Sequence, residues 1–470
     1  MNPVLQQDIK DIENILEKVK QQGIDFLNVI DDVPTSTQNT ITTDRNLNES
    51  GLGALSALEE FNQRLAPLMV SQAGPKYWGF VTGGATPASI VGDWLTTIYD
   101  PNAQATKAQG GVSALIEIET INLLLQLLDL PKSFLGGFVT GATMSNFTCL
   151  AVARQWFGKQ LDQDFAKNGI STPLNILTAT PHSSAVKCLA MLGIGSQNFT
   201  KTKTVEGNRE AIDIIDLEQN IKSLNGQPFI LISSAGTVNT ADFDDFVAIT
   251  KLKEKYNFWW HIDAAFGGFA ACTPKYKHLV SGWENADSIT IDCHKWLNVP
   301  YESAFYLIKE QHRNLQVETF QNSNAPYLGD PLENFSYLNF LPENSRRLKA
   351  LPVWFSLLAY GKKGFQDIIE NSVEMALLLD TFITNNESFE LLASTRLNNV
   401  CFTLAGEHNQ EKVNLFLTHL NDKGKVFMTP TVYQNQKGIR ASFVNWRTTE
   451  FDVQLAIAEM KASVLELGIE

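Results

Sequence analysis

The middle of the chain alternates between short apolar runs and amphipathic stretches of helical period. The apolar runs are rich in β-branched and aromatic residues and have the length of buried strands. They cover residues 138–139, 174–178, 228–233, 258–262 and 288–292. Strands that alternate with helices in this way are typical of a mostly parallel sheet covered by helices. The pattern therefore predicts an α/β fold.

Helical periodicity dominates the two ends of the chain. Apolar residues recur at helical spacing over 3–22 and 52–70, and the polar segment 31–51 between them predicts an extended crossing. An isolated helix of this kind is marginally stable, so we expect the N-terminal helix to pack on another surface, such as a second subunit. Further helices are expected over 87–99, 111–130, 351–360, 413–420 and 451–467, and further strands over 398–404 and 439–446.

These patterns divide the chain into three parts. Residues 1–70 form an N-terminal helical and extended segment that we expect to pack on a partner subunit. Residues 71–345 form a large domain that contains the parallel sheet, and residues 346–470 form a small C-terminal domain. A chain of 470 residues is long enough for two or three domains.

Polar residues follow four of the predicted strands directly. They are His182, Thr237, Asp263 and Lys295. In an open parallel sheet, ligands bind outside the carboxyl ends of the strands. If these strands share one sheet, the four side chains converge on one crevice, which is the predicted functional site.

Lys295 and Asp263 are the two charged members of this group. Lys295 lies between His294 and Trp296, just after an apolar strand. A partly desolvated lysine can act as an amine nucleophile, although a lysine at a strand end can also simply extend its charge to solvent. Asp263 closes a nearly all-apolar run, where a carboxylate needs a cationic partner.

Two glycine-containing segments add candidate binding surfaces. Residues 141–144 form a Gly-Ala-Thr-Met turn that opens a helix, and free N–H groups at a helix start attract anions. Residues 77–87 place aromatic residues beside consecutive glycines, which indicates a loop whose backbone approaches another group closely. The alternative is a glycine-rich turn capped by core aromatic residues.

Composition and charge exclude several classes of partner. A net charge of −14 and a pI near 5.1 argue against nucleic acid or an anionic membrane as a partner. No apolar run is long enough to span a bilayer, and the N-terminus lacks a signal-peptide pattern. The five cysteines are scattered without paired spacing, which indicates neither disulfides nor a zinc site. We therefore expect a reducing, cytoplasmic compartment.

An amine, a buried carboxylate, an anion-binding turn and a flat imidazole together fit pyridoxal 5′-phosphate. The chain resembles the group II pyridoxal-phosphate-dependent amino-acid decarboxylases, which include aromatic-amino-acid and glutamate decarboxylases. The resemblance covers about residues 51–449. Its motifs, in chain order, are Gly-Phe-Val-Thr-Gly-Ala-Thr-Met-Ser-Asn, Pro-His-Ser-Ser, Ala-Gly-Thr-Val-Asn-Thr, His-Ile-Asp-Ala-Ala-Phe-Gly-Gly and His-Lys-Trp-Leu.

The resemblance implies a fold-type I pyridoxal-phosphate-dependent transferase architecture and a role for each matching residue. Lys295 would be the Schiff-base lysine and Asp263 the partner of the pyridine nitrogen. His182 would stack on the ring and help to place the substrate carboxylate. Ala265 would pack on the opposite ring face, and Thr237 would lie beside the cofactor.

The same resemblance assigns the phosphate and the substrate. The backbone of Thr143 and Met144, together with His294, would hold the phosphate. Thr82 would lie near the substrate carboxylate. The aromatic residues of the same loop, Phe80 and Trp78 among them, are expected to form a wall of the substrate site. Position 292 is Asp where a common family form has Asn. Because an anion there repels phosphate, no direct phosphate contact is assigned to Asp292.

The family carries a catalytic tyrosine in a loop that precedes an arginine pair. Here Tyr337 has the matching spacing to Arg346 and Arg347, and Tyr327 is its nearby competitor. The resemblance therefore implies Tyr337 as the acid that returns a proton to Cα, with Tyr327 as the alternative.

The predicted activity is α-decarboxylation of an L-amino acid to an amine and CO2. Tyr77, Trp78 and Phe80 favour an aromatic substrate, whereas residues 93–97 are closer to the glutamate and cysteine-sulfinate branch. The alternatives are an aldehyde lyase of the sphingosine-phosphate lyase type and a catalytically silent scaffold dimer. By resemblance, we expect a homodimer with active sites at the subunit interface.

Overall fold

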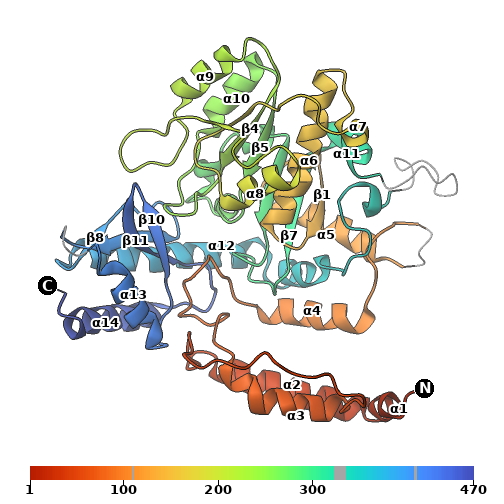
Figure 1. Cartoon of the computed structure of the whole chain (residues 1–470), viewed down its shortest axis with the longest axis vertical. Coiled ribbons are helices and arrows are strands. Elements are labelled where there is room, and N and C mark those ends of the chain that lie inside the picture. The colour runs from red at the N-terminus through yellow and green to blue at the C-terminus, as the bar shows by residue number, and fades with distance from the viewer. Residues whose placement is uncertain (108–110, 322–334, 407–409, 470) are drawn as a thin grey trace.

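The computed structural model describes residues 1–107, 111–321, 335–406 and 410–469. At its centre is a seven-stranded sheet with helices on both faces (Figure 1). In order across the sheet, the strands are β1 (Phe134–Val139), β7 (Ala304–Lys309), β6 (Ser288–Asp292), β5 (Phe258–Asp263), β4 (Phe229–Ser234), β2 (Ile176–Thr178) and β3 (Thr200–Lys201). Only β7 runs antiparallel to its neighbours. The carboxyl ends of β1, β2, β4, β5 and β6 therefore meet at one edge of the sheet.

The alternation of side chains along the strands explains why helices cover both faces. In β4, Phe229 and Leu231 belong to one apolar core, and Ile230 and Ile232 belong to the other. The first core is closed by α5 (Ser113–Leu127), α9 (Ile214–Ser223), α10 (Phe246–Lys255) and the first half of α12 (Ala350–Thr384). The second is closed by α6 (Ala142–Gln160), α7 (Phe165–Asn168), α8 (Ser183–Met191) and α11 (Arg313–Phe320).

A smaller antiparallel sheet follows in the C-terminal part of the chain. Its order is β10 (Thr429–Tyr433), β11 (Gln436–Ser442), β9 (Asn399–Leu404) and β8 (Phe389–Leu391). It shares an apolar core with the second half of α12, α13 (Val413–Asp422) and α14 (Glu450–Glu466). Helix α12 joins the two sheets and is bent at Gly361, whose φ of 56° is accessible to glycine without a Cβ clash.

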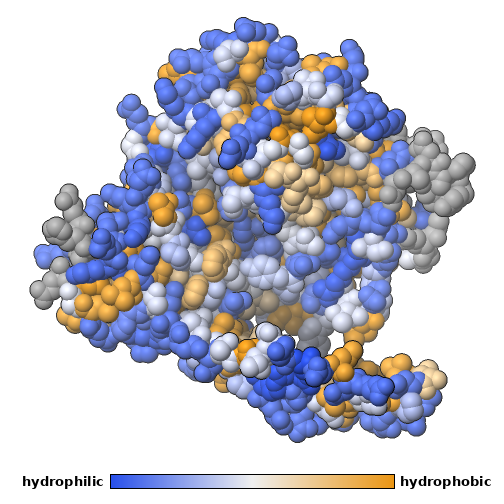
Figure 2. All heavy atoms as spheres, viewed as in Figure 1, coloured by the Kyte–Doolittle hydropathy of each residue, from blue (hydrophilic) through white to orange (hydrophobic). Residues whose placement is uncertain are grey.

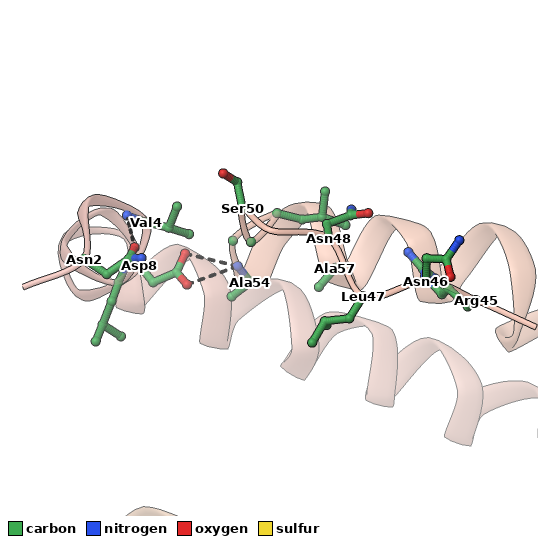
Figure 3. Close-up of a pocket in the computed structure, with 14 residues that line it drawn as sticks. Asn2, Val4, Asp8, Arg45, Asn46, Leu47, Asn48, Ser50, Ala54 and Ala57 are labelled. Atoms are coloured by element: carbon green, nitrogen blue, oxygen red, sulfur yellow. Dashed lines mark hydrogen bonds between the residues drawn. The ribbon is translucent and has the colours of Figure 1, made fainter.

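The N-terminal helices lie beside this body and bury little of their own surface (Figure 1). They are α1 (Pro3–Lys10), α2 (Ile12–Val29) and α3 (Ala54–Arg64), and none of them contains a fully buried residue. The Asp8 carboxylate accepts a hydrogen bond of 3.1 Å from the Ala54 N–H and so joins α1 to the start of α3 (Figure 3). Apolar and polar residues both reach the surface of these N-terminal helices (Figure 2). Its exposed apolar residues include Leu5, Ile9, Ile12, Leu16 and Val19.

Several predicted elements have the predicted bounds, and others need correction. Strand β6 and helix α4 (Pro87–Tyr99) agree with the prediction residue for residue. The single helix predicted over 3–22 is divided at Asp11, and the strand predicted over 439–446 is β11, which ends at Ser442. Strand β7 was not predicted. Short 3-10 turns occur at Ala66–Leu68, Gly267–Cys272, Lys277–Val280, Trp283–Asn285, Glu310–His312 and Tyr337–Asn339.

The domain boundaries drawn from the sequence remain a prediction. The seven-stranded sheet falls within 71–345 and the four-stranded sheet within 346–470. No helix in the described part of the chain combines the length and the apolar character that a membrane span requires.

Candidate active site

A crevice of about 280 Å³ lies at the edge where the strands end. Six of the residues predicted from the sequence line it, and they come from the ends of separate strands and from the loop after α3. These are Phe80, His182, Thr237, Asp263, Ala265 and Lys295. The shared sheet edge therefore brings together the amine, the carboxylate and the imidazole.

Lys295 forms an ion pair that the sequence did not reveal. Its Nζ lies 2.8 Å from Asp292 Oδ2, and both side chains are largely buried. A buried carboxylate is costly unless a cation compensates it. The lysine supplies that cation, so the charge of Asp292 is matched inside the site rather than left facing an anion-binding turn.

Asp263 is held by two hydrogen bonds from neighbouring groups. Its Oδ2 accepts from Asn146 Nδ2 at 2.9 Å, and its Oδ1 accepts from the Ala265 N–H at 3.2 Å. An ionised carboxylate has about four acceptor positions. The carboxylate is thus fixed in orientation while it retains capacity to accept from a cationic ligand group in the crevice.

His182 presents a neutral, flat ring to the crevice. It is the N-cap residue of α8, and its Nδ1 accepts from the Ser184 N–H at 3.2 Å and lies 2.7 Å from Ser184 Oγ. Burial lowers the pKa of His182, although the nearby Asp263 opposes that effect. The imidazole is therefore uncharged at neutral pH.

The start of α6 and His294 form a candidate anion site next to the crevice. Helix α6 begins after Gly141 without a side-chain cap, and in the described chain the N–H groups of Thr143 and Met144 have no protein acceptor. His294 Nδ1 is buried and also lacks a hydrogen-bond partner among the described residues. An orphaned ring nitrogen beside free helix N–H groups fits a phosphate. These residues do not line the crevice itself.

The loop that covers the site is backbone-strained and closely packed. Phe80 and Val81 have φ values of 56° and 57°, which is a left-handed conformation that costs about 1–3 kcal/mol for such residues. At Gly83, an added Cβ would lie 2.1 Å from the Lys295 carbonyl oxygen. The loop therefore approaches the backbone of Lys295 so closely that only glycine fits, as the sequence pattern predicted.

Two of the residues predicted to bind substrate do not line the crevice. Trp78 is 1% exposed; its indole N–H donates to the Pro75 carbonyl, and its ring lies 4.4 Å from Phe443 in the core of the small domain. Thr82 belongs to the loop itself, where it is 7% exposed and its N–H donates to the Gly79 carbonyl at 3.1 Å.

Tyr337 lies away from the crevice of its own chain, and its assignment as the acid stays a prediction. Its side chain is 0% exposed, its hydroxyl donates to the Gly136 carbonyl at 3.3 Å, and its ring lies 4.4 Å from the Arg346 guanidinium. It borders a separate cavity of about 160 Å³. Because the buried Arg346 holds this segment against β1, the phenol does not reach the crevice. Tyr327, the alternative, lies outside the described residues.

Sequence reasoning missed Asn146 and His261. Asn146 lies on the face of α6 that covers the sheet and touches Asp263, and His261 is 0% exposed in β5. A signal was present for His261, because residues two apart in a strand share a face and His261 precedes Asp263 by two positions. For Asn146, the signal is its place at the end of the first matched family motif, which by itself assigns the residue no role.

Known proteins resemble this chain in both sequence and fold. The sequence profile of the pyridoxal-dependent decarboxylase conserved domain matches residues 37–405. An aromatic-L-amino-acid decarboxylase of Bacillus atrophaeus is 27% identical over 96% of this chain and 97% of its own length. A crystal structure of Oryza sativa TDC with PLP and tryptamine superposes with a TM-score of 0.88 at 20% identity, over 98% of this chain and 99% of that one.

A crystal structure of mouse CSAD superposes with a TM-score of 0.86 at 20% identity, over 96% of this chain and 98% of that one. At this level of identity, the two structures show the fold alone. They confirm the predicted fold class, in which a mostly parallel sheet is followed by a small C-terminal α/β domain.

Proposed function

We propose that this chain, which belongs to the pyridoxal-dependent decarboxylase family, releases CO2 from the α-carbon of an aromatic L-amino acid. Membership of the family makes it a decarboxylase that uses pyridoxal 5′-phosphate, and the aromatic substrate is what we infer. The grouping of Lys295, Asp263 and His182 around one crevice supports the chemistry. The observation that carries the aromatic substrate is the presence of Phe80 and Phe266 at the same crevice.

Each of these side chains has a part in the proposed reaction. Bound pyridoxal phosphate supplies a ring that accepts the electron pair left when the bond from Cα to the carboxylate breaks. Lys295 offers the amine that holds the cofactor and that yields to the substrate amine. Asp263 offers a carboxylate to the protonated ring nitrogen, and the neutral ring of His182 offers a flat contact surface. Thr143, Met144 and His294 would hold the phosphate.

The proton that returns to Cα needs a donor that reaches the crevice. The buried position of Tyr337 argues against it. Tyr327 is the remaining tyrosine of this stretch, and we propose it as the donor on sequence grounds.

Replacing Tyr327 by phenylalanine is expected to lower the rate of amine formation by about a hundredfold or more, because a positioned general acid contributes that much. Tyr337→Phe is the matched control. It removes one hydrogen bond of 3.3 Å and is expected to lower the free energy of unfolding by about 1 kcal/mol without changing the amine yield. Amine and CO2 are quantified together by chromatography and gas release. A loss of amine in Tyr337→Phe alone would restore the original assignment.

Aromatic side chains at the crevice support an aromatic substrate. Phe80 and Phe266 both line it, and Phe80 is 63% exposed at its border. Aromatic walls favour planar apolar side chains through burial and ring contacts. The similarity to an aromatic-L-amino-acid decarboxylase points in the same direction.

One observation favours an acidic substrate as the second candidate. Arg440, from β11, lines the crevice, donates to the Val238 carbonyl at 3.0 Å, and has a buried Nε without a partner among the described residues. Burial lowers the pKa of Arg440, although Glu210 opposes that effect. A buried guanidinium with unused donors would match a second carboxylate on the substrate.

A screen of the twenty amino acids for CO2 release separates the two candidates. We expect aromatic amino acids to be turned over, and we expect Arg440→Met to change their kcat/KM by less than about tenfold, since the guanidinium makes no bond to an aromatic ring edge. An acidic substrate, with a loss of a hundredfold or more in Arg440→Met, would select the second candidate, because a buried charge pair would be broken.

We also propose a homodimer with sites at the subunit interface. The apolar residues that α1 and α2 leave exposed support it, because an isolated helix pair with such a surface is marginally stable.

A further inference from the structure

A chain of buried hydrogen bonds lies beneath the carboxylate of Asp263. His261 and Asp263 lie on the same face of β5, and Asn146 on α6 bridges them. Asn146 Nδ2 is 2.9 Å from Asp263 Oδ2, and Asn146 Oδ1 is 2.8 Å from His261 Nε2. On its other side, His261 Nδ1 is 2.9 Å from Ser288 Oγ, which accepts from the Trp259 indole N–H at 2.9 Å.

The carboxylate determines the direction of every hydrogen bond in this chain. An ionised carboxylate only accepts, so Asn146 must turn its amide nitrogen toward Asp263 and its oxygen toward His261. His261 must then carry its proton on Nε2, and its Nδ1 accepts from the Ser288 hydroxyl. Burial lowers the pKa of His261 to about 4, so the imidazole stays neutral and in this tautomer at neutral pH.

Both N–H donors and the carbonyl oxygen of the Asn146 amide have hydrogen-bond partners. Its second N–H donates to Ser184 Oγ at 3.2 Å, and Ser184 in turn contacts His182 Nδ1 at 2.7 Å. Asn146, His261 and Ser288 are each 0% exposed. A rotated amide would place its oxygen against Asp263 and its nitrogen against the His261 N–H, and both contacts are repulsive. The Asp263 carboxylate and the Nε2–H tautomer of His261 therefore favour the same orientation of the amide.

We propose that His261 is a positioning residue that acts through Asn146 to fix the Asp263 carboxylate for the ring nitrogen of the cofactor. The proposal rests on the assignment of Asp263 as the partner of that nitrogen. A fully satisfied buried network is rigid, so Asp263 need not reorganise when a cationic ring nitrogen arrives. Without the network, Asp263 would rotate to find other donors and would meet the nitrogen less favourably.

The test compares the dissociation constants of two probes, measured by absorbance titration of the full-length protein freed of cofactor. One probe is pyridoxal phosphate, and the other is its analogue with carbon in place of the ring nitrogen. In His261→Leu, binding of pyridoxal phosphate is expected to weaken about tenfold more than binding of the analogue, because one charge-assisted hydrogen bond is misaligned. His261→Gln keeps a donor for Asn146 and an acceptor for Ser288. It is expected to return the ratio of the two dissociation constants to its wild-type value.

Two further variants keep the test decisive. Asn146→Ala interrupts the network from α6 and leaves β5 unaltered. It should also weaken binding of pyridoxal phosphate about tenfold more than binding of the analogue, so the test remains possible if His261→Leu does not fold. Ser233→Ala is the matched control, since it removes a buried 2.7 Å hydrogen bond from the Trp260 indole and a 3.4 Å hydrogen bond to the His261 carbonyl. Neither bond involves the His261 imidazole, the Asn146 amide or the Asp263 carboxylate. This control should weaken both probes equally or not at all.

Equal weakening of both probes in His261→Leu and in Asn146→Ala would overturn the proposal and leave the network a purely structural role. Because the readout is binding rather than turnover, the result does not depend on which amino acid is the substrate. A wild-type chain that binds both probes as expected yet releases no CO2 would overturn the proposed function alone.

Discussion

Lys295→Ala is expected to reduce CO2 release by at least about a thousandfold and to abolish the visible absorbance of the bound cofactor, because the side chain provides the amine that holds it. Among the described residues that line the crevice, Lys295 is the only lysine. The measurement is the absorbance spectrum of the purified protein after addition of pyridoxal phosphate, followed by an assay of CO2 release.

The alanine variant has a second effect that must be separated from the first. It leaves Asp292 buried without the cation that lies 2.8 Å away, which destabilises a protein by about 3–5 kcal/mol. Lys295→Arg retains a cation opposite Asp292 but lacks the nucleophilic amine, so it should fold and still be inactive. Lys309→Ala, at the end of β7, removes a half-buried lysine outside the crevice and should remain active. Retained cofactor absorbance in Lys295→Arg would contradict the assignment.

A loss of stability of similar size is expected at a second buried ion pair. Arg346 and Glu117 are joined by two hydrogen bonds of 2.9 and 2.8 Å, with side chains 1% and 0% exposed. The guanidinium also donates to the carbonyls of Ala103 and Phe138. Arg346→Met leaves the carboxylate uncompensated and is expected to lower the free energy of unfolding by about 3–5 kcal/mol. Urea denaturation of the protein with its cofactor measures this loss.

The neighbouring arginine provides the control. Arg347 pairs with Asp93 at 2.7 Å in a half-exposed position, so Arg347→Met should lower the free energy of unfolding by less than about 1 kcal/mol. The double variant Glu117→Gln with Arg346→Met should be more stable than Arg346→Met alone, because it no longer buries an unpaired charge. Equal effects of Arg346→Met and Arg347→Met would show that the buried pair contributes no more than the surface pair.

Much of the site could be predicted because the functional residues follow strands whose apolar character is visible in the sequence. Asp263 and Lys295 end or follow such runs, and parallel strands carry their ends to one edge. The glycine-rich loop was predictable for another reason: consecutive glycines indicate a backbone that approaches another group closely. In the structure, Gly83 tolerates no side chain beside the Lys295 carbonyl. The family motifs around these residues then indicated the cofactor.

Contacts between residues far apart in the chain could not be predicted in this way. Tyr337 has the spacing of a loop acid, but the burial of Arg346 beside it keeps its phenol in the core. Trp78 lies two residues from the crevice-lining Phe80, yet its indole points into the small domain. Spacing along the chain does not specify which way a loop side chain turns, because packing against distant elements decides it.

The sequence by itself determined the alternating α/β pattern, the family and the residues that offer an amine, a carboxylate and an imidazole. Each depends on local periodicity or on a contiguous motif. Only the tertiary structure decided that Asp292 neutralises Lys295 and that His261 and Asn146 orient Asp263. Those relations join separate strands and a helix across the sheet, and a hydrogen bond or ion pair forms only where folding brings its two partners within about 3 Å.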